Sequence, residues 1–316
     1  KNKHMELGPR DRLSQAFWQE QQKGRVIQGP MGDVVHLDLR HLGEKYLKER
    51  LPFICELAKA YVGVDPVKEP IPVRPTAHYT MGGIGTDGKC ATRMPGLYAA
   101  GECASVGLHG ANRLGSNSLS EIVVFGKVAG EQAAEFAATQ QHGNTEALAA
   151  KAEALIKQHL SLMDIDGTEN PADIRNELGM SMEAGVGIYR TEELMQGTID
   201  KINELKARYK KVKINDKSSV FNTDLLYAIE LGYMLDVAEA MAHSAINRKE
   251  SRGSHQRLDG YEERDDVNFL KHTLSFYNQE GAPTIDYSDV KITKSQPAKR
   301  VYGSEGEKQD EAKKNG

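Results

Sequence analysis

The chain contains stretches in which apolar residues recur every three or four positions, separated by glycine- and proline-rich breaks. This spacing predicts a first helix that Pro9 opens and that stops near Gly24, because proline fits the first helical position and glycine ends helices. A second helical stretch, residues 43–63, has a break or kink at Pro52. The same spacing predicts helices over 118–138, 145–160, 171–185, 191–212 and 219–249, and short links between the last four are typical of a bundle.

A smaller number of strands is predicted where apolar and polar residues alternate or a short apolar run ends at glycine. Val35, Leu37 and Leu39 share one face of a predicted strand over 34–40. Further short strands or extended segments are predicted at LYAAGE (97–102), HTLSFY (272–277) and DVKIT (289–293). Helices and strands together predict an α+β multidomain protein.

Changes in composition along the chain predict the domain boundaries. Four prolines between residues 66 and 75 restrict themselves and the residues before them, so this segment is an extended connector and a boundary. The predicted domains are listed by residue range: 1–75, 76–140, 141–250 and 251–303. The mixed-charge tail, 304–316, has no apolar residue that could pack and is predicted to be disordered.

Composition excludes several functional classes. With 39% apolar residues and a net charge of −4, the chain can bury a core but lacks the basic surface of a nucleic-acid-binding protein. No apolar run is long enough to cross a bilayer. Cys55, Cys90 and Cys103 are far apart, which indicates reduced thiols and no metal site.

The stretch HGANRLGSNSL, residues 109–119, is rich in glycine and polar residues and directly precedes a predicted helix. We expect Ser118 to cap this helix, with Glu121 completing a capping box. Free amides at a helix N-terminus favour an anionic or nucleotide ligand. Glu102 ends the LYAAGE strand, where it could bind a ribose hydroxyl or simply be a solvated turn residue. A nearby GIGTDG (83–88) follows a loop and leads to Pro95, so a flexible turn is expected there.

Arg113 lies inside this glycine-rich stretch and has two possible explanations. It could be an ordinary surface arginine. Alternatively, it could join Arg10, His78 and His109, which lie in similar turns, in a clamp for a small dicarboxylate. Arginine binds a carboxylate through two parallel charge-assisted hydrogen bonds, which makes it suited to that task.

Five motifs in this order, HYTMGGI, GLYAAGE, GLHGANRLGSNSL, ESRGSHQRLDGYEERDD and AKRVYG, closely resemble the flavoprotein subunit of fumarate reductase and succinate dehydrogenase. The long glycine-rich motif and the AKRVYG ending look more like the quinol-dependent fumarate reductase branch. L-aspartate oxidase has a similar HGANR segment, but it typically has TCGG where this chain has Thr80 to Gly83. An L-aspartate oxidase-like enzyme, a succinate dehydrogenase or a non-catalytic interaction fragment remain the alternatives.

The resemblance implies identities for the domains. Residues 1–75 would be part of a capping, substrate-binding domain, and 76–140 the C-terminal part of an α/β FAD-binding domain. A helical domain, 141–250, and a small C-terminal domain, 251–303, would follow. The chain would then be about the C-terminal half of the subunit. The histidine that links FAD covalently is expected upstream, and the chain alone should hold FAD weakly.

The resemblance also implies an activity and partners. The subunit would reduce fumarate to succinate by hydride transfer from FAD, with the reverse oxidation possible. It would assemble with an iron–sulfur subunit and membrane anchor subunits at the cytoplasmic face of the inner membrane, as a peripheral protein.

Residue by residue, Arg10 in the GPRD turn matches the proton donor of the family. Its neighbour Asp11 could orient it or simply be a first-turn helix charge. His78 and Arg113 match the residues that hold the substrate carboxylates. The positions that match FAD contacts are Tyr79, Glu102, Ser118 and Leu119. For the charged stretch 251–266, the resemblance favours a structural role over a solvated loop.

Overall fold

The computed structural model describes residues 8–29, 32–141, 143–294 and 296–298. The described residues form two units, each considered by itself. The first contains the chain up to His78 with the short segment 296–298, and the second begins at Tyr79. The predicted tail 304–316 and most of the AKRVYG motif lie outside the described residues.

The first unit combines a three-stranded antiparallel sheet with three helices. β2 (Gly32–Leu37) is the central strand and pairs with β1 (Ile27–Gly29) and β3 (Ile71–Val73). The proline-rich segment predicted as a plain connector therefore supplies a strand. Pro72 lies opposite His36 in an edge strand, a position that tolerates the missing amide hydrogen.

The helices of the first unit follow the predicted pattern. α1 (Arg10–Gln22) begins directly after Pro9, and the break at Pro52 separates α2 (Glu44–Arg50) from α3 (Pro52–Val62). A single 3-10 turn, η2 (Arg40–Leu42), precedes α2. The small core of this unit consists of Phe17, Leu47, Ala58, Pro66 and Ile71.

The second unit begins with two short strands and a long helix. β4 (Ile84–Gly85) pairs in parallel with β5 (Ala104–Ser105), and α4 (Asn117–Thr139) follows. The strand predicted at LYAAGE is wrong, because that segment contributes only an isolated bridge from Tyr98 to Ala91. GIGTDG opens no helix, as expected, but the flexible turn expected over the whole motif is confirmed only at its end, because Ile84 and Gly85 form β4.

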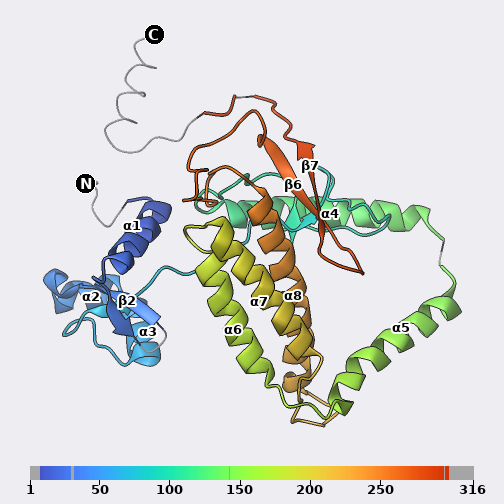
Figure 1. Cartoon of the computed structure of the whole chain (residues 1–316), viewed down its shortest axis with the longest axis horizontal. Helices are drawn as coiled ribbons and strands as arrows, with labels where there is room; N and C mark the ends of the chain where they lie inside the picture. Colours follow the sequence, from blue (N-terminus) through green and yellow to red (C-terminus); the bar gives the residue numbers. More distant parts are fainter. Residues whose placement is uncertain (1–7, 30–31, 142, 295, 299–316) are drawn as a thin grey trace. The chain divides into compact units, whose positions relative to one another are not determined.

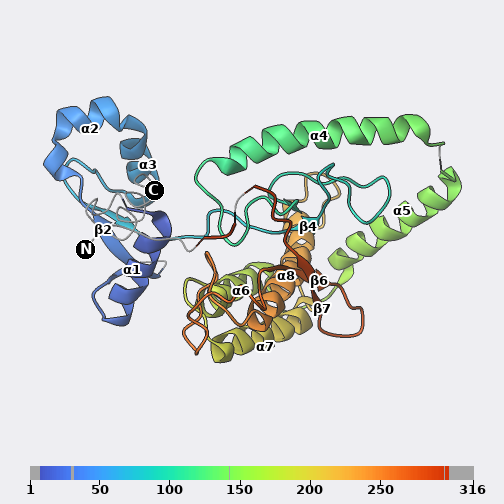
Figure 2. The same cartoon turned by 90° about the horizontal axis from the view of Figure 1, so that it is seen from above.

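The predicted apolar face of α4 is not buried by the described residues. Among the described residues, Glu121 alone is a buried member of the helix, and nothing approaches the Cβ positions of Gly126 and Gly130. Figure 2 shows α4 lying outside the helical bundle of this unit. Within the described chain, no other backbone therefore closes on these two glycines.

The bundle consists of α6 (Pro171–Val186), α7 (Glu192–Tyr209) and α8 (Thr223–Asn247), which pack side by side (Figure 1). Side chains of Asn170, Thr191 and Asn222 accept hydrogen bonds from the first-turn amides of these helices, which fixes where each begins. α5 (Thr145–Leu160) and η3 (Ser161–Asp164) precede the bundle, and no described α5 residue is buried. The predicted bundle is thus confirmed for three of its four helices.

The core of the second unit lies between these three helices. Its buried members are Ile174, Leu178, Val186, Met195, Ile199, Ile202, Leu205, Val212, Leu231, Leu235, Ala238, Ala242 and Ala245. Small alanines on α8 allow the larger side chains of α6 and α7 to fill the space between helices.

A hairpin follows the bundle. β6 (Lys271–Phe276) pairs antiparallel with β7 (Thr284–Asp289). The strand predicted at HTLSFY is confirmed. At DVKIT, where a strand or an extended segment is predicted, only Asp289 belongs to a strand, because β7 ends at this residue. The alternating apolar and polar residues of DVKIT lie after Asp289, the last residue that pairs with β6.

The loop between α8 and the hairpin is held by buried charges. Arg257 is fully buried and forms a two-pronged ion pair with Asp259, with distances of 2.8 and 2.6 Å. Glu250 is also fully buried. The structural role expected for residues 251–266 is therefore confirmed, because a solvated loop would not bury paired charges.

His255 lies in the same loop and is fixed as one tautomer. Its Nε2 donates to the carbonyl oxygen of Arg248 at 2.9 Å, so Nδ1 accepts from Arg190 at 2.8 Å. Burial, and next the charge of Arg190, lower the pKa of His255 from 6.5 to about 4. Arg248 and Arg257 also face this imidazole with positive charge.

No described helix is long and apolar enough to cross a membrane. Cys55, Cys90 and Cys103 all carry free thiols, in agreement with the reduced cysteines predicted from their spacing.

The state of His255 predicts a pH dependence of stability. Between pH 4 and 6.5 the imidazole of His255 is protonated in the unfolded chain and neutral in the folded chain. The free energy of unfolding should therefore rise with pH across this window. Near pH 4 it should be about 3 kcal/mol lower than above pH 6.5. Urea unfolding followed by circular dichroism measures this. His255→Gln should flatten the dependence, because glutamine can donate to Arg248 and accept from Arg190 without titrating.

The matched control is Gln256→Asn in the same loop, which changes no titrating side chain and should keep the wild-type slope. An unchanged slope in His255→Gln would contradict the assignment of the proton uptake to this residue.

Candidate functional site

The candidate site lies where the segment after Tyr79 meets the turn between β5 and α4. Gly83 allows this meeting, because a Cβ at this position would lie 2.5 Å from the carbonyl oxygen of Cys103. Its φ of +129° is also one that other residues rarely adopt. The chain then pairs β4 with β5 and brings residues 79–80 beside the turn 101–116.

A buried carboxylate organises the site. Glu121, on the first turns of α4, is 3% exposed and accepts a hydrogen bond of 2.7 Å from the hydroxyl of Tyr79. The same carboxylate oxygen lies 2.6 Å from Nε2 of His109, which donates to it. The rings of Tyr79 and His109 meet edge to face, with centroids 5.3 Å apart. Three residues from separate segments are therefore locked together.

The phenol of Tyr79 is kept protonated by its surroundings. Burial, followed by the hydrogen bond to Glu121 and the charge of that carboxylate, raises the pKa of Tyr79 to about 12. Tyr79 therefore remains a neutral hydrogen-bond donor at physiological pH.

Arg113 packs on the ring of this tyrosine. Its guanidinium carbon lies 4.7 Å from the centroid of the Tyr79 ring, a cation–π contact. Nη1 donates to the carbonyl of Leu114 at 2.9 Å. Nε is buried and has no hydrogen-bond partner among the described residues. An unpaired buried donor is costly, so the guanidinium has bonding capacity that a ligand with acceptor oxygens could use.

Glu102 is exposed and accepts a hydrogen bond of 2.8 Å from the backbone amide of Thr80. This bond ties the segment after Tyr79 to the turn that begins at Gly101. It occupies one of the two carboxylate oxygens, and a carboxylate can accept further bonds. Glu102 is therefore more than a freely solvated turn residue.

Ser118 and Leu119 lie in the first turn of α4, where the prediction placed them. The predicted capping box is wrong, since the N-cap of the helix is Ser116, two residues before Ser118, and it makes no side-chain capping bond. Glu121 cannot reach back to the cap because its carboxylate is bonded to Tyr79 and His109. Leu119 is 65% exposed.

The two remaining predicted residues belong to the first unit. Arg10 is the exposed first residue of α1, and its carbonyl accepts from the hydroxyl of Ser14 at 3.0 Å. His78 is exposed and is the last residue of that unit before the boundary. The structure brings together Tyr79, His109 and Arg113 from the residues that the sequence singled out, and adds Glu121 as the partner of the tyrosine and the histidine.

Glu121 is the site residue whose role the sequence did not predict. The capping-box pattern gave its carboxylate a plausible local partner. A signal was nevertheless present, because Glu121 follows the predicted turn directly and lies in an otherwise apolar helix segment, beside Ile122 and Val123. An acid in such a position needs a buried hydrogen-bond donor.

Comparisons with known proteins identify relatives over almost the whole chain. The model of an FAD binding domain matches residues 2–119, and that of the fumarate reductase flavoprotein C-terminal region matches 175–302. The fumarate reductase flavoprotein subunit of Serratia sp. (strain ATCC 39006) is 70% identical over 315 residues, which are 99% of this chain and 53% of that protein. The chain thus spans about half the length of the curated relatives it matches.

A solved structure of Escherichia coli quinol fumarate reductase superposes with a TM-score of 0.89 and 69% identity, covering 96% of this chain and 52% of that one. The succinate dehydrogenase flavoprotein subunit of Rickettsia bellii is 41% identical over 317 aligned positions, covering 94% of this chain and 52% of that protein. The chain is therefore more similar to these fumarate reductase subunits than to this succinate dehydrogenase subunit.

The bond between Tyr79 and Glu121 predicts how the phenol responds to a substitution. Glu121→Gln removes the negative charge, so the pKa of Tyr79 should fall from about 12 while burial keeps it above 10. Titration of tyrosinate absorbance, taken as the difference between each protein and its Tyr79→Phe counterpart, measures this pKa. A pKa of Tyr79 that is the same with and without the carboxylate would contradict the proposed arrangement.

Proposed function

Because the chain belongs to the fumarate reductase flavoprotein subunit family, we propose that it carries the substrate-binding residues of an enzyme that reduces fumarate to succinate. Succinate oxidation is the reverse of the same chemistry. The observation that carries this proposal is the guanidinium of Arg113, which is packed on Tyr79 and left with a buried, unpaired donor. The oxygens of a dicarboxylate would accept hydrogen bonds from this guanidinium.

FAD fits the residues present around this arginine. Tyr79, Glu102, Ser118 and Leu119 would hold it, with Glu102 accepting from hydroxyl groups and the start of α4 offering backbone amides. When bound, FAD supplies the hydride equivalent that reduction of an alkene requires. A histidine that links it covalently would come from outside these 316 residues.

Arg113 and His78 would bind the two carboxylates of the substrate. Their positive or hydrogen-bonding groups hold the substrate and also stabilise negative charge that develops on a carboxylate during reduction. The ring of Tyr79 supports the guanidinium of Arg113 through the cation–π contact, and the hydrogen bond to Glu121 keeps this ring in place. Tyr79 is neutral, so the positive charge of Arg113 lies over an uncharged ring.

Arg10 would give a proton to the substrate carbon. The support for this role is the GPRD turn, which matches the family. A guanidinium is a weak acid, so Arg10 would act as a relay that donates a proton and regains one from neighbouring carboxylic acids. Asp11 adjoins it in the sequence and is the first candidate for such a neighbour.

The electron source would be a quinol, reached through an iron–sulfur subunit and membrane anchor subunits at the cytoplasmic face of the membrane. Solved structures similar to this chain include one titled as a quinol-fumarate reductase with menaquinol molecules. A succinate dehydrogenase is the second candidate, favoured by the 41% identity to the Rickettsia subunit. The ratio of fumarate reduction to succinate oxidation by the assembled enzyme distinguishes the two.

Replacing Arg113 tests the carboxylate-binding role. In the full-length flavoprotein subunit, Arg113→Ala should weaken binding of malonate, a simple dicarboxylate, about ten- to a hundredfold, because it removes a charge-assisted bond worth roughly 1.5–3 kcal/mol. The melting temperature should change little. Calorimetry and thermal unfolding on one preparation measure both.

The control is Arg93→Ala, which removes another arginine that packs on an aromatic ring, 5.2 Å from the centroid of Phe276, but lies outside the predicted site. It should leave malonate affinity unchanged. If Arg113→Ala lowers only the melting temperature, Arg113 is a structural residue.

Replacing Arg10 tests the proton relay. Arg10→Lys in the full-length subunit should retain FAD and malonate binding but lose most of kcat, because lysine cannot reproduce the guanidinium geometry. Arg12→Lys, two residues further along α1, is the control and should be nearly as active as wild type. Near-normal turnover of Arg10→Lys would remove Arg10 from the mechanism.

A further inference from the structure

A turn in the C-terminal loop touches the backbone of the stretch that carries Arg113. The carbonyl oxygen of Ala111 accepts two hydrogen bonds from Ser254, one from the backbone amide at 2.9 Å and one from the hydroxyl at 2.8 Å. Gly253 comes so close that a Cβ on it would lie 2.5 Å from the same oxygen and 2.8 Å from the Cβ of Ala111. We call these interactions the tip contact.

Gly253 and Ser254 are held at the tip of a tight turn. The amide of Arg252 donates to the carbonyl of His255 at 2.8 Å, and the amide of His255 donates back to the carbonyl of Arg252 at 3.0 Å. Gly253 has a φ of +59°, which a glycine adopts without strain. The turn therefore presents the glycine and the serine, and little else, to Ala111.

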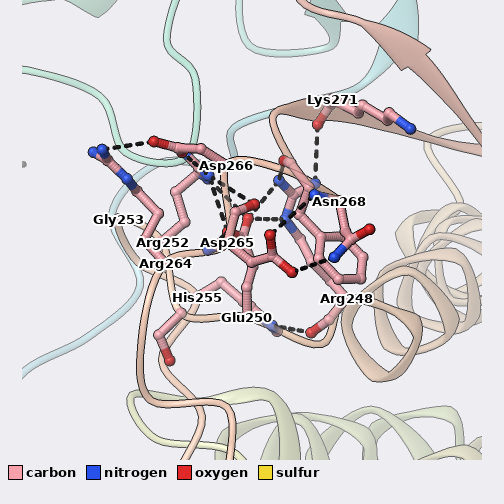
Figure 3. Close-up of polar contacts among 12 residues, drawn as sticks. Arg248, Glu250, Arg252, Gly253, His255, Arg264, Asp265, Asp266, Asn268 and Lys271 are labelled. Carbon is pink, nitrogen blue, oxygen red and sulfur yellow. Dashed lines mark hydrogen bonds and ion pairs between the residues drawn. The ribbon is translucent and has the colours of Figure 1, made fainter. Parts of the chain in front are cut away.

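A buried carboxylate fixes the base of this turn (Figure 3). Glu250 accepts bonds from Nε and Nη2 of Arg248, at 2.9 and 2.7 Å, and from the same two atoms of Arg252, at 2.8 and 3.0 Å. The amide of Asp265 adds another at 2.9 Å. Arg248 also donates to the carbonyl of Lys271 at the start of β6.

This network leaves the turn little freedom to move. Removing one partner of a buried ion pair leaves an uncompensated charge, so each member holds the others in place. Arg252 extends from the turn itself, and Arg248 is the C-cap of α8, the long helix of the bundle. The tip contact is thus built on a loop that buried ion pairs join to the end of this helix.

The stretch on the other side of the contact has few internal restraints. Ala111 is two residues before Arg113, and glycines occupy positions 110 and 115. Tyr79 supports the guanidinium, but its bonds go to Glu121 and His109 and do not hold the backbone of residues 110–113. The two bonds to the Ala111 carbonyl do hold that backbone.

We propose that Gly253 and Ser254 are positioning residues for Arg113: through the tip contact they set the backbone from which its guanidinium reaches the substrate. This inference rests on the proposed carboxylate-binding role of Arg113. It gives the loop after α8 a part in substrate affinity, although none of its residues belongs to the predicted set of ligand contacts.

The test uses the full-length flavoprotein subunit with FAD bound and malonate as the probe. Ser254→Ala removes the hydroxyl bond and keeps the backbone bond, so the Kd for malonate should rise about three- to tenfold. Ser254→Thr keeps a hydroxyl and should restore affinity close to wild type. Gly253→Ala should weaken binding at least as much, because the new Cβ displaces Ala111.

The control for Gly253→Ala is Gly260→Ala in the same loop. Gly260 also has a positive φ, +91°, but a Cβ there would meet nothing within 4 Å. This variant carries the same kind of backbone strain without the contact. Its malonate Kd should equal that of the wild type, whatever its melting temperature.

A double-mutant cycle with Arg113→Ala separates this inference from the proposed function. If Ser254 acts through Arg113, adding Ser254→Ala to Arg113→Ala should cause no further loss of affinity. An equal loss with and without Arg113 would overturn the positioning role. So would Ser254→Ala and Gly253→Ala variants with the affinity of Gly260→Ala. If Arg113→Ala itself leaves the Kd unchanged, the carboxylate-binding role fails, and the positioning role fails with it.

Discussion

The hydrogen bond from the hydroxyl of Tyr79 to the buried carboxylate of Glu121 is the interaction on which the candidate site depends. A carboxylate inside a protein must have its oxygens occupied by donors, and Glu121 draws these from two other segments of the chain. The tyrosine ring is thereby fixed, and a fixed ring offers Arg113 a platform. Together with the bond from Thr80 to Glu102 and the pairing of β4 with β5, this bond holds the segment after residue 78 beside α4 and the glycine-rich turn.

The second constraint comes from the part of the chain that follows the site in the sequence, namely the helical bundle and the loop after α8. The helical bundle has the large apolar core, and the loop after α8 has the buried charges. Two hydrogen bonds from Ser254 to the backbone carbonyl of Ala111 join this loop to the glycine-rich turn. A rigid scaffold and a flexible, glycine-rich binding turn are often found together, and here the bonds that join them can be named.

The sequence predicted the helices well because their signals are local. Helix starts are marked by local residues, whatever the rest of the fold is. These residues are Pro9, Pro52 and the capping residues Asn170, Thr191 and Asn222. The strands were predicted less well. β3 lies in a proline-rich segment and exists because an edge position needs few amide donors, and β7 is defined by its partner and not by its own alternation.

The sequence predicted the site only as far as the resemblance to the flavoprotein subunit family identified its residues. The sequence singled out Arg113 and Tyr79 but could not show that they pack on each other, since 34 positions separate them. It assigned Glu121 to a local capping bond because sequence patterns reveal near partners and not distant ones. The tip contact was invisible for the same reason. Its consequence is a steric constraint on substitution: a Cβ at position 253 would lie 2.8 Å from the Cβ of Ala111, so the side chain at either position can be enlarged only if the backbone at the other moves away. These two positions, far apart in the sequence, are therefore coupled in the substitutions that the fold can accept.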